Sequence, residues 1–258
     1  MDKRSKIEFK FFTRLALFEL TGRTASNLQE FLEQIELADD SIIFYHTHQF
    51  LLEHNFLVPE PPNDFAEWVI NALHERALGE RLASIDTYQF ENLAVLKERI
   101  IKILKDHLDE RYGGKKDIPK KKLLPEKLVK LGSRIFFRRP EKERYRFAEV
   151  KQEERFHFIR STSFVFPTPY VANTLSEFRY ALSQVSLNSI YYHLFESSLR
   201  FGNAEENHFS SWLEKGLGMP DLADEVRRLT PYTRTLEELR RKIIALIDKQ
   251  LTKEGKNG

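Results

Sequence analysis

The sequence contains no cysteine and no long apolar run, and only 2 of its 258 residues are tryptophan. The absence of cysteine excludes disulfide frameworks, thiolate zinc sites, iron–sulfur clusters and cysteine nucleophiles. No stretch approaches the roughly 20 apolar residues that a membrane helix needs, and the first residues lack the apolar segment of a signal peptide. We therefore expect a cytoplasmic protein with no membrane partner.

The sequence also has little net charge, because 41 Lys and Arg face 39 Asp and Glu. This balance argues against a general preference for nucleic acid. The charge is uneven, however, since residues 111–155 hold 16 Lys and Arg against 7 Asp and Glu. This segment is either a solvated connection or a site for RNA or phosphate, and we expect nucleic acid not to be the partner. The candidate contacts in it are Lys120, Lys121, Lys122, Arg138 and Arg139.

The common catalytic signatures are absent as well. The chain has no Gly-rich phosphate loop, no Gly-x-Ser-x-Gly elbow and no His-Glu-x-x-His. We therefore expect neither a metal nor a cofactor, and the sequence leans away from an enzyme.

What the sequence does contain is an internal repeat. Residues 9–46 align without a gap on residues 156–193, and 10 of the 38 positions are identical. The register resumes after a loop, so that the two tryptophans, Trp68 and Trp212, are equivalent. The repeat predicts a first unit over residues 1–110, a basic linker or insert over 111–155 and a second unit over 156–258.

Each unit has mainly helical periodicity. Phe9 and Phe11 open the first unit with the alternation of a strand, and capping residues followed by apolar stripes indicate helices behind it. In the first unit these helices are expected to begin near Ser26, Asp40, Asp64, Leu78 and Asn92. The prediction is a mainly α fold, in which two tandem pseudo-symmetric helical repeats share one globular body. The opening strands would add only a minor β component.

One histidine is common to both units, His46 in the first and His193 in the second. On a helix His193 and Glu196 share a face, so the three residues are catalytic candidates for acid–base work. The other interpretation is structural, with each histidine half-buried and hydrogen-bonded. The sequence favours the structural role because no nucleophile accompanies the histidines.

Three further residues are candidates for ligand binding: His48, Glu60 and Asp64. On a strand, His46 and His48 would share a face and could chelate a metal, whereas on a helix they point apart. The pattern favours a helix. Glu60 and Asp64 form a carboxylate pair across a proline-rich loop, but Asp64 is more simply explained as the cap of the following helix.

The chain resembles a bacterial and archaeal family of unknown function. In the first unit the resemblance lies in Phe44–His48 (FYHTH), Pro59–Phe65 (PEPPNDF) and Leu78–Asp86 (LGERLASID). In the second it lies in Tyr191–Glu196 (YYHLFE) and Leu229–Tyr232 (LTPY). The resemblance carries no catalytic residues, and it implies an association with carbohydrate metabolism.

These observations favour a non-enzymatic binding or regulatory module for a protein partner or a small polar ligand. An enzyme that uses His46 and His193 in a cleft between the repeats is one alternative. An RNA- or phosphate-binding protein that uses the basic segment 111–155 is another. A deep pocket lined by both histidines would favour the enzyme, and a flat apolar patch would favour a protein partner.

Overall fold

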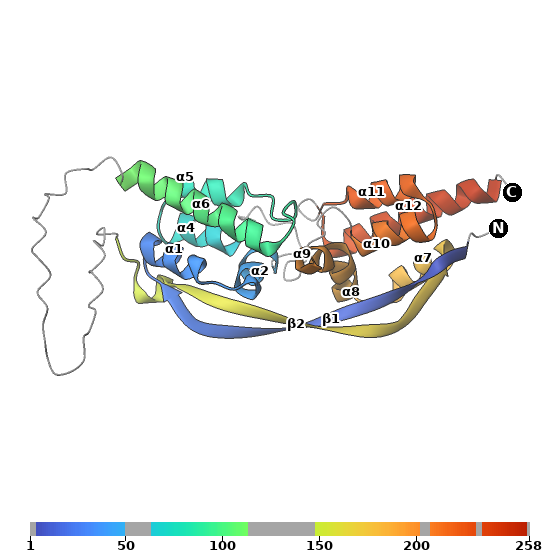
Figure 1. Ribbon diagram of the computed structural model, residues 1–258, viewed down its shortest axis with the longest axis horizontal. Helices are drawn as coiled ribbons and strands as arrows, with labels where there is room; N and C mark the ends of the chain where they lie inside the picture. The colour runs from blue at the N-terminus through green and yellow to red at the C-terminus, as the bar shows by residue number, and fades with distance from the viewer. Residues whose placement is uncertain (1–3, 50–62, 113–147, 202–206, 231–233, 257–258) are drawn as a thin grey trace, which may run out of the picture.

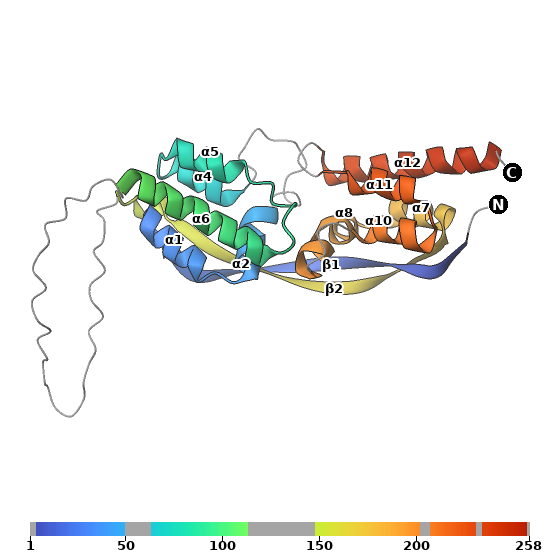
Figure 2. The same cartoon turned by 45° about the horizontal axis from the view of Figure 1, so that its top comes forward.

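A long two-stranded ribbon runs through the molecule. The computed structural model describes residues 4–49, 63–112, 148–201, 207–230 and 234–256. Strands β1 (Arg4–Ala25) and β2 (Phe156–Thr174) pair antiparallel along their length. The helices gather in two lobes on one face of this ribbon (Figure 1), and the turned view in Figure 2 shows the same two lobes side by side.

The helices of each lobe follow one strand in sequence. The first lobe consists of α1 (Leu28–Glu36), α2 (Asp40–His48), α4 (Asp64–Asn71), α5 (Arg76–Ala83) and α6 (Leu93–Tyr112). A short 3₁₀ turn, η1 (Gln152–Glu154), precedes β2. The second lobe consists of α7 (Leu175–Gln184), α8 (Leu187–Tyr191), η2 (Tyr192–Glu196), α9 (Ser197–Phe201), α10 (His208–Ser211), η3 (Trp212–Gly216), α11 (Pro220–Arg227) and α12 (Leu236–Lys256). The elements η2 and η3 are π-helical turns.

Equivalent residues cap equivalent helices. Asn27 caps α1 by accepting from the Glu30 N–H, and Thr174 does the same for α7. Asn63 caps α4, and Asn207 caps α10. The prediction that Asp64 caps its helix is therefore wrong by one residue. The carboxylate of Asp64 instead has another partner, described below.

The aromatic core of each lobe includes a phenylalanine from the opening strand of the other repeat. Phe9, in β1, packs in the second lobe, and Phe156, in β2, packs in the first. The ring contacts, with centroids 5.1–5.6 Å apart, are those of Phe9 with Phe178, Phe209 and Trp212 and of Phe156 with Phe31, Phe65 and Trp68. The two repeats have thus exchanged their opening strands, so neither lobe is complete without the other repeat.

The prediction of a minor β component is wrong. The strands are 22 and 19 residues long, and they form the central element to which both helical lobes attach. The alternation of buried and exposed residues along β1 is interrupted, because the pairing register between β1 and β2 shifts between Lys10 and Phe12. Phe9 and Phe11 therefore face the lobes, whereas Leu15 and Leu17 face away from them, 54% and 55% exposed.

The ribbon has a pseudo-two-fold axis at its centre. Ala16 pairs with Ser163. These are equivalent positions, because Ala16 follows Phe9 by as many residues as Ser163 follows Phe156. The axis therefore passes through this pair and relates one lobe to the other.

Arg14 occupies the core near this axis and joins the two lobes. Its Nη1 lies 3.0 Å from the Glu196 Oε2 of the second lobe, and both side chains are buried. Its Nη2 donates to the Gln49 Oε1 of the first lobe over 3.5 Å. The guanidinium lies 5.2 Å from the centre of the Tyr191 ring, a cation–π contact. Gln49 and Glu196 are equivalent positions of the two units, so Arg14 contacts the same position in both units.

Candidate functional site

The two shared histidines make the same pair of hydrogen bonds. The backbone N–H of Ile159, in β2, donates to His46 Nε2 over 2.9 Å. The backbone N–H of Phe12, in β1, donates to His193 Nε2 over 2.8 Å. Ile159 and Phe12 are themselves equivalent positions of the two strands. Each histidine therefore binds the exchanged strand of the other repeat.

These bonds define the tautomer of each ring. Because Nε2 accepts from a backbone N–H, it carries no proton, and a neutral ring must hold its proton on Nδ1. His46 Nδ1 lies 2.7 Å from Asp64 Oδ2 and donates to it, whereas His193 Nδ1 lies 3.1 Å from His208 Nδ1. Burial lowers the pKa of His46, against the opposing effect of Asp64. Burial, with His208 second, lowers the pKa of His193 well below its usual value. Both rings are neutral at pH 7.

The catalytic candidates do not form one site. Phe12 and Leu20, the residue that pairs with Ile159, are eight positions apart on β1. At about 3.3 Å per strand residue, this places His46 and His193 about 26 Å apart along the ribbon. Glu196 is fully buried and faces Arg14. The expectation that both histidines are buried and hydrogen-bonded is confirmed.

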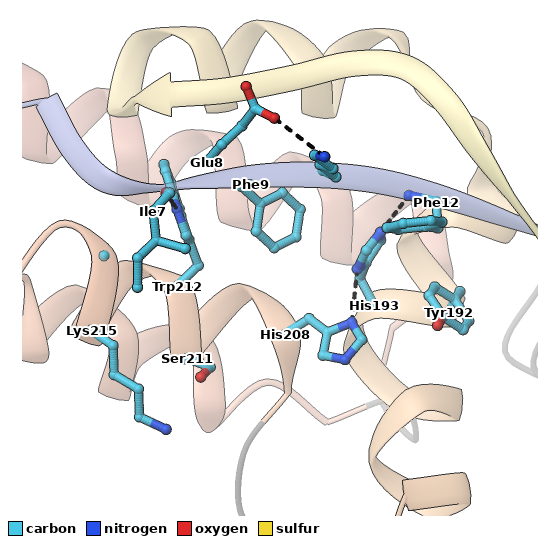
Figure 3. A pocket seen from close by; sticks show the side chains of 12 residues that line it. Ile7, Glu8, Phe9, Phe12, Tyr192, His193, His208, Ser211, Trp212 and Lys215 are labelled. Carbon is cyan, nitrogen blue, oxygen red and sulfur yellow. Dashed lines mark hydrogen bonds and ion pairs between the residues drawn. The ribbon is translucent and has the colours of Figure 1, made fainter.

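A groove in the second lobe lies beside His193. It lies between β1 and the helical segment that includes α10 and η3, and it has a volume of about 400 Å³. Its lining includes the pair His193 and His208, the aromatic Tyr192, and Ser211 and Lys215. Figure 3 shows His208 below His193, with Ser211 and Lys215 further along the same helical segment. Both π-helical turns line this groove, and π-turns are frequent at functional sites.

The other ligand-binding candidates lie elsewhere. His48 is fully buried in the first lobe, where its Nε2 lies 3.1 Å from the Thr87 carbonyl and its ring stacks on Phe44. Burial lowers the pKa of His48 to about 3. The Asp64 side chain is 44% exposed, and its carboxylate accepts the hydrogen bond from His46 Nδ1. Glu60 and the basic candidates Lys120, Lys121, Lys122, Arg138 and Arg139 lie outside the described residues.

The described residues contain neither a cluster of metal ligands nor a membrane-spanning helix. Over the described ranges, no three His, Asp or Glu side chains cluster as metal ligands would. None of the helices in this part of the chain has both the length and the apolar character needed to cross a membrane.

The family model of a family of unknown function, DUF5752, matches residues 6–124 and again residues 135–248. The chain belongs to this family. The two matches confirm the internal repeat and the predicted resemblance to a family of unknown function. A search among curated proteins found no match.

A solved structure shares this fold. The structure of OrfY from Thermoproteus tenax aligns with a TM-score of 0.70 and 23% identity, over 95% of this chain and 96% of that chain. At this identity the likeness shows a common fold alone.

Sequence reasoning identified His193 but missed other residues that line the groove. His208, Ser211 and Lys215 stand where the first unit has Asp64, Glu67 and Asn71. The signal that could have found them is this change of charge between otherwise equivalent helices. Arg14 was missed because its counterpart in the second unit, Ser161, gives no sign of a shared role.

Proposed function

We propose that this protein is a non-enzymatic binding module that holds a small polar ligand in the groove of the second lobe. The observation that carries the proposal is the engagement of both ring nitrogens of His46 and His193. A general base needs a free ring nitrogen near its substrate. Here Nε2 accepts from the backbone and Nδ1 is held by a side chain. The histidines act as connectors of strands and helices.

The groove supports binding because it combines an apolar wall with polar groups at its mouth. Phe9 and Trp212 form the wall, and both are buried. Ser211 and Lys215 lie at the more exposed side. A concave site with few polar groups on an apolar wall is typical of small-ligand sites. The association with carbohydrate metabolism that the family resemblance implies makes sugars and their derivatives the first compounds to test.

The proposal is tested by a thermal-shift panel of sugars, sugar phosphates and nucleotides, followed by recovery of each bound compound. We expect at least one compound to raise the melting temperature and to be recovered unchanged by mass spectrometry. The Ser211→Trp variant, which fills the groove, should lose the shift. The matched variant Glu67→Trp, at the equivalent exposed position of the first lobe, should keep it. Conversion of the compound by the protein, lost in His193→Gln, would contradict the proposal, as would a panel without any shift.

A protein partner is the second candidate, and the outer face of the ribbon favours it. Four large apolar residues lie together near the centre of the ribbon, at positions that alternate with the buried Arg14 and Ser161. They are 44–55% exposed and consist of Leu15, Leu17, Phe164 and Phe166. Leu15 pairs directly with Phe164, so the patch is continuous across both strands.

The dimensions of this face fit a second copy of the chain. A 22-residue strand is about 70 Å long, and two strands are about 10 Å wide, which gives about 700 Å². A standard interface buries about 800 Å² on each partner. Sedimentation velocity should therefore show a dimer that the Leu15→Ser/Phe164→Ser variant dissociates. A monomer at all concentrations up to about 0.1 mM would refute this candidate.

A further inference from the structure

The second lobe contains a chain of two hydrogen bonds whose directions are fixed. The Phe12 N–H donates to His193 Nε2, so the proton of the neutral His193 ring lies on Nδ1. That proton points at His208 Nδ1, 3.1 Å away, which must accept it. Figure 3 shows both bonds, which run from β1 through His193 to His208. Burial lowers the pKa of His208, so its ring is neutral at pH 7 and carries its single proton on Nε2.

This chain cannot accept a further proton without losing a bond. A proton added to His208 must go to Nδ1, where it faces the Nδ1–H of His193. Two N–H groups that point at each other cannot form a hydrogen bond, because neither nitrogen has a free lone pair. His193 cannot move its own proton to Nε2, because that proton would face the Phe12 N–H. One added proton therefore breaks one of the two bonds.

The bond that breaks is the one between the two histidines. The His193 residue is only 1% exposed, whereas His208 is partly exposed at the groove. Because burial penalises the charged form of a ring, the added proton goes to the less buried histidine. His208 is then charged and loses its bond to His193, while His193 keeps its bond to β1.

The surroundings of His208 do not compensate this charge. From η2 the titratable groups that face it are His193 and Tyr192, with ring centres 5.2 Å and 5.8 Å away. The charged residues of β1 and η3 that line the same groove are Glu8, Lys10 and Lys215. The Glu8 carboxylate lies 3.8 Å from Lys10 Nζ. Among the described residues, none forms an ion pair with His208. A charged His208 is therefore better solvated when it turns out toward water.

The first lobe responds to acid differently, although its histidine makes the same strand contact. His46 Nδ1 donates to Asp64 Oδ2, and the Ile159 N–H donates to His46 Nε2. A carboxyl group can take a proton on its other oxygen while Oδ2 still accepts. Both bonds of the first lobe therefore survive an added proton. The lobes differ here because Asp64 stands at the position equivalent to His208.

We infer that His193 and His208 form an acid-sensitive latch, which opens the groove of the second lobe when His208 takes up a proton. Helix α10 begins at His208, and with η3 it forms the side of the groove opposite β1. Trp212 Nε1 still donates to the Ile7 carbonyl over 2.6 Å, so the groove opens at its His208 end. The inference rests on the proposed binding function and adds its regulation: a ligand is held at neutral pH and released in acid.

The test is hydrogen–deuterium exchange of the full chain without ligand, at pH 7.5, 6.5 and 5.5. Protection of residues 207–216 is compared with that of the equivalent residues 63–72 in the same sample, so the pH dependence of intrinsic exchange cancels. In the open state His208 has the ordinary pKa of about 6.5. We therefore expect the protection of 207–216 to fall below this pH, by up to about tenfold per pH unit. Residues 63–72 should keep their protection.

Two variants exchange the residues that distinguish the lobes. His208→Asn places the neutral isostere of Asp64 in the second lobe. Its amide oxygen accepts from His193 Nδ1 but takes up no proton, so the loss of protection in acid should disappear. Asp64→His should bring that loss to residues 63–72. A loss that persists in His208→Asn would overturn the latch, as would unchanged protection of 207–216 between pH 7.5 and pH 5.5 in the unsubstituted chain.

The exchange measurements need no ligand, so they separate the latch from the binding function. If a compound from the thermal-shift panel binds, we expect its affinity to fall between pH 7.5 and pH 5.5 and to fall less in His208→Asn. Equal affinity at both pH values would overturn the regulation of the groove while the binding function stands. A panel without any shift, together with acid opening of 207–216, would contradict the binding function and support the latch.

Discussion

His46 and His193 each join a helix of one repeat to the strand of the other through the same ring nitrogen. A lysine side chain would not reproduce this role, because its ammonium group only donates, whereas the residue must accept at one end and donate at the other. For these two histidines, the sequence predicted much of the role that the structure shows. The shared position showed that the histidine matters to both repeats, and the absence of a nucleophile favoured a structural role. The identity of the partners could not be predicted, since they come from a strand more than a hundred residues away.

Removal of either shared histidine should destabilise the fold. His46→Ala and His193→Ala each leave a buried backbone N–H of the ribbon without its acceptor, which costs about 1–3 kcal/mol before any cavity is counted. Urea unfolding of the full chain measures this. The exposed His157, on the same ribbon, supplies the control, and His157→Ala should change stability by less than about 0.5 kcal/mol. Equal stability of all three variants would show that the two bonds do not hold the ribbon.

The buried His48 should make stability depend on pH. Its pKa is about 3 in the folded chain against 6.5 in the unfolded chain, so the unfolded state binds the extra proton between these values. The contribution is complete above pH 6.5 and is lost as the pH falls below it, with a slope of about 1.4 kcal/mol per pH unit. His48→Phe, which places the residue of the second unit at this position, should reduce the slope between pH 6 and pH 4. An unchanged slope, measured by urea unfolding at each pH, would contradict the burial of His48.

At the scale of the elements, the helices could be predicted and the ribbon could not. Apolar spacing and caps placed α1 and α4 to within a residue or two, because these signals are local. The strands run much further than the alternation indicated, since the shift between Lys10 and Phe12 interrupts it. Strand exchange leaves no signal in one sequence, because Phe9 and Phe156 have equal apolar character whichever lobe they fill.

Replacement of one member of the Arg14–Glu196 pair should destabilise the fold much more than replacement of both. Arg14→Met alone leaves the Glu196 carboxylate buried beside an apolar group, and the loss of one partner of a buried ion pair costs about 3–5 kcal/mol. The Arg14→Met/Glu196→Leu double variant should recover most of this loss in urea unfolding. Arg76→Ala, which breaks the exposed pair with Glu80, should change stability by less than about 1 kcal/mol. A double variant as unstable as the single one would refute the pairing.

At the scale of the whole molecule, strand exchange makes the two repeats interdependent. Phe156 completes the aromatic core of the first lobe, so the first repeat by itself lacks part of that core. The pseudo-two-fold axis at Ala16–Ser163 suggests how the gap could be filled, since a second copy of one repeat would offer its own strand in the same place.

A fragment of residues 1–112 should therefore not fold as a monomer. We expect it either to be unfolded or to form a dimer in which two copies exchange strands, and circular dichroism with light scattering distinguishes these states. Addition of residues 148–258 should produce a one-to-one complex with a cooperative melting transition. A fragment that melts cooperatively as a monomer would show that the exchanged strand is dispensable.

The central claim is that His46 and His193 are neutral connectors with no ring nitrogen free for catalysis. The most direct measurement is the ¹⁵N–¹H NMR spectrum of the imidazole rings in the full chain, recorded from pH 5 to pH 8. The account predicts that both rings are neutral at pH 7, with the proton on Nδ1 and Nε2 unprotonated, and that both titrate below pH 6.5. A proton on Nε2, or a titration of either ring near pH 6.5, would contradict the account.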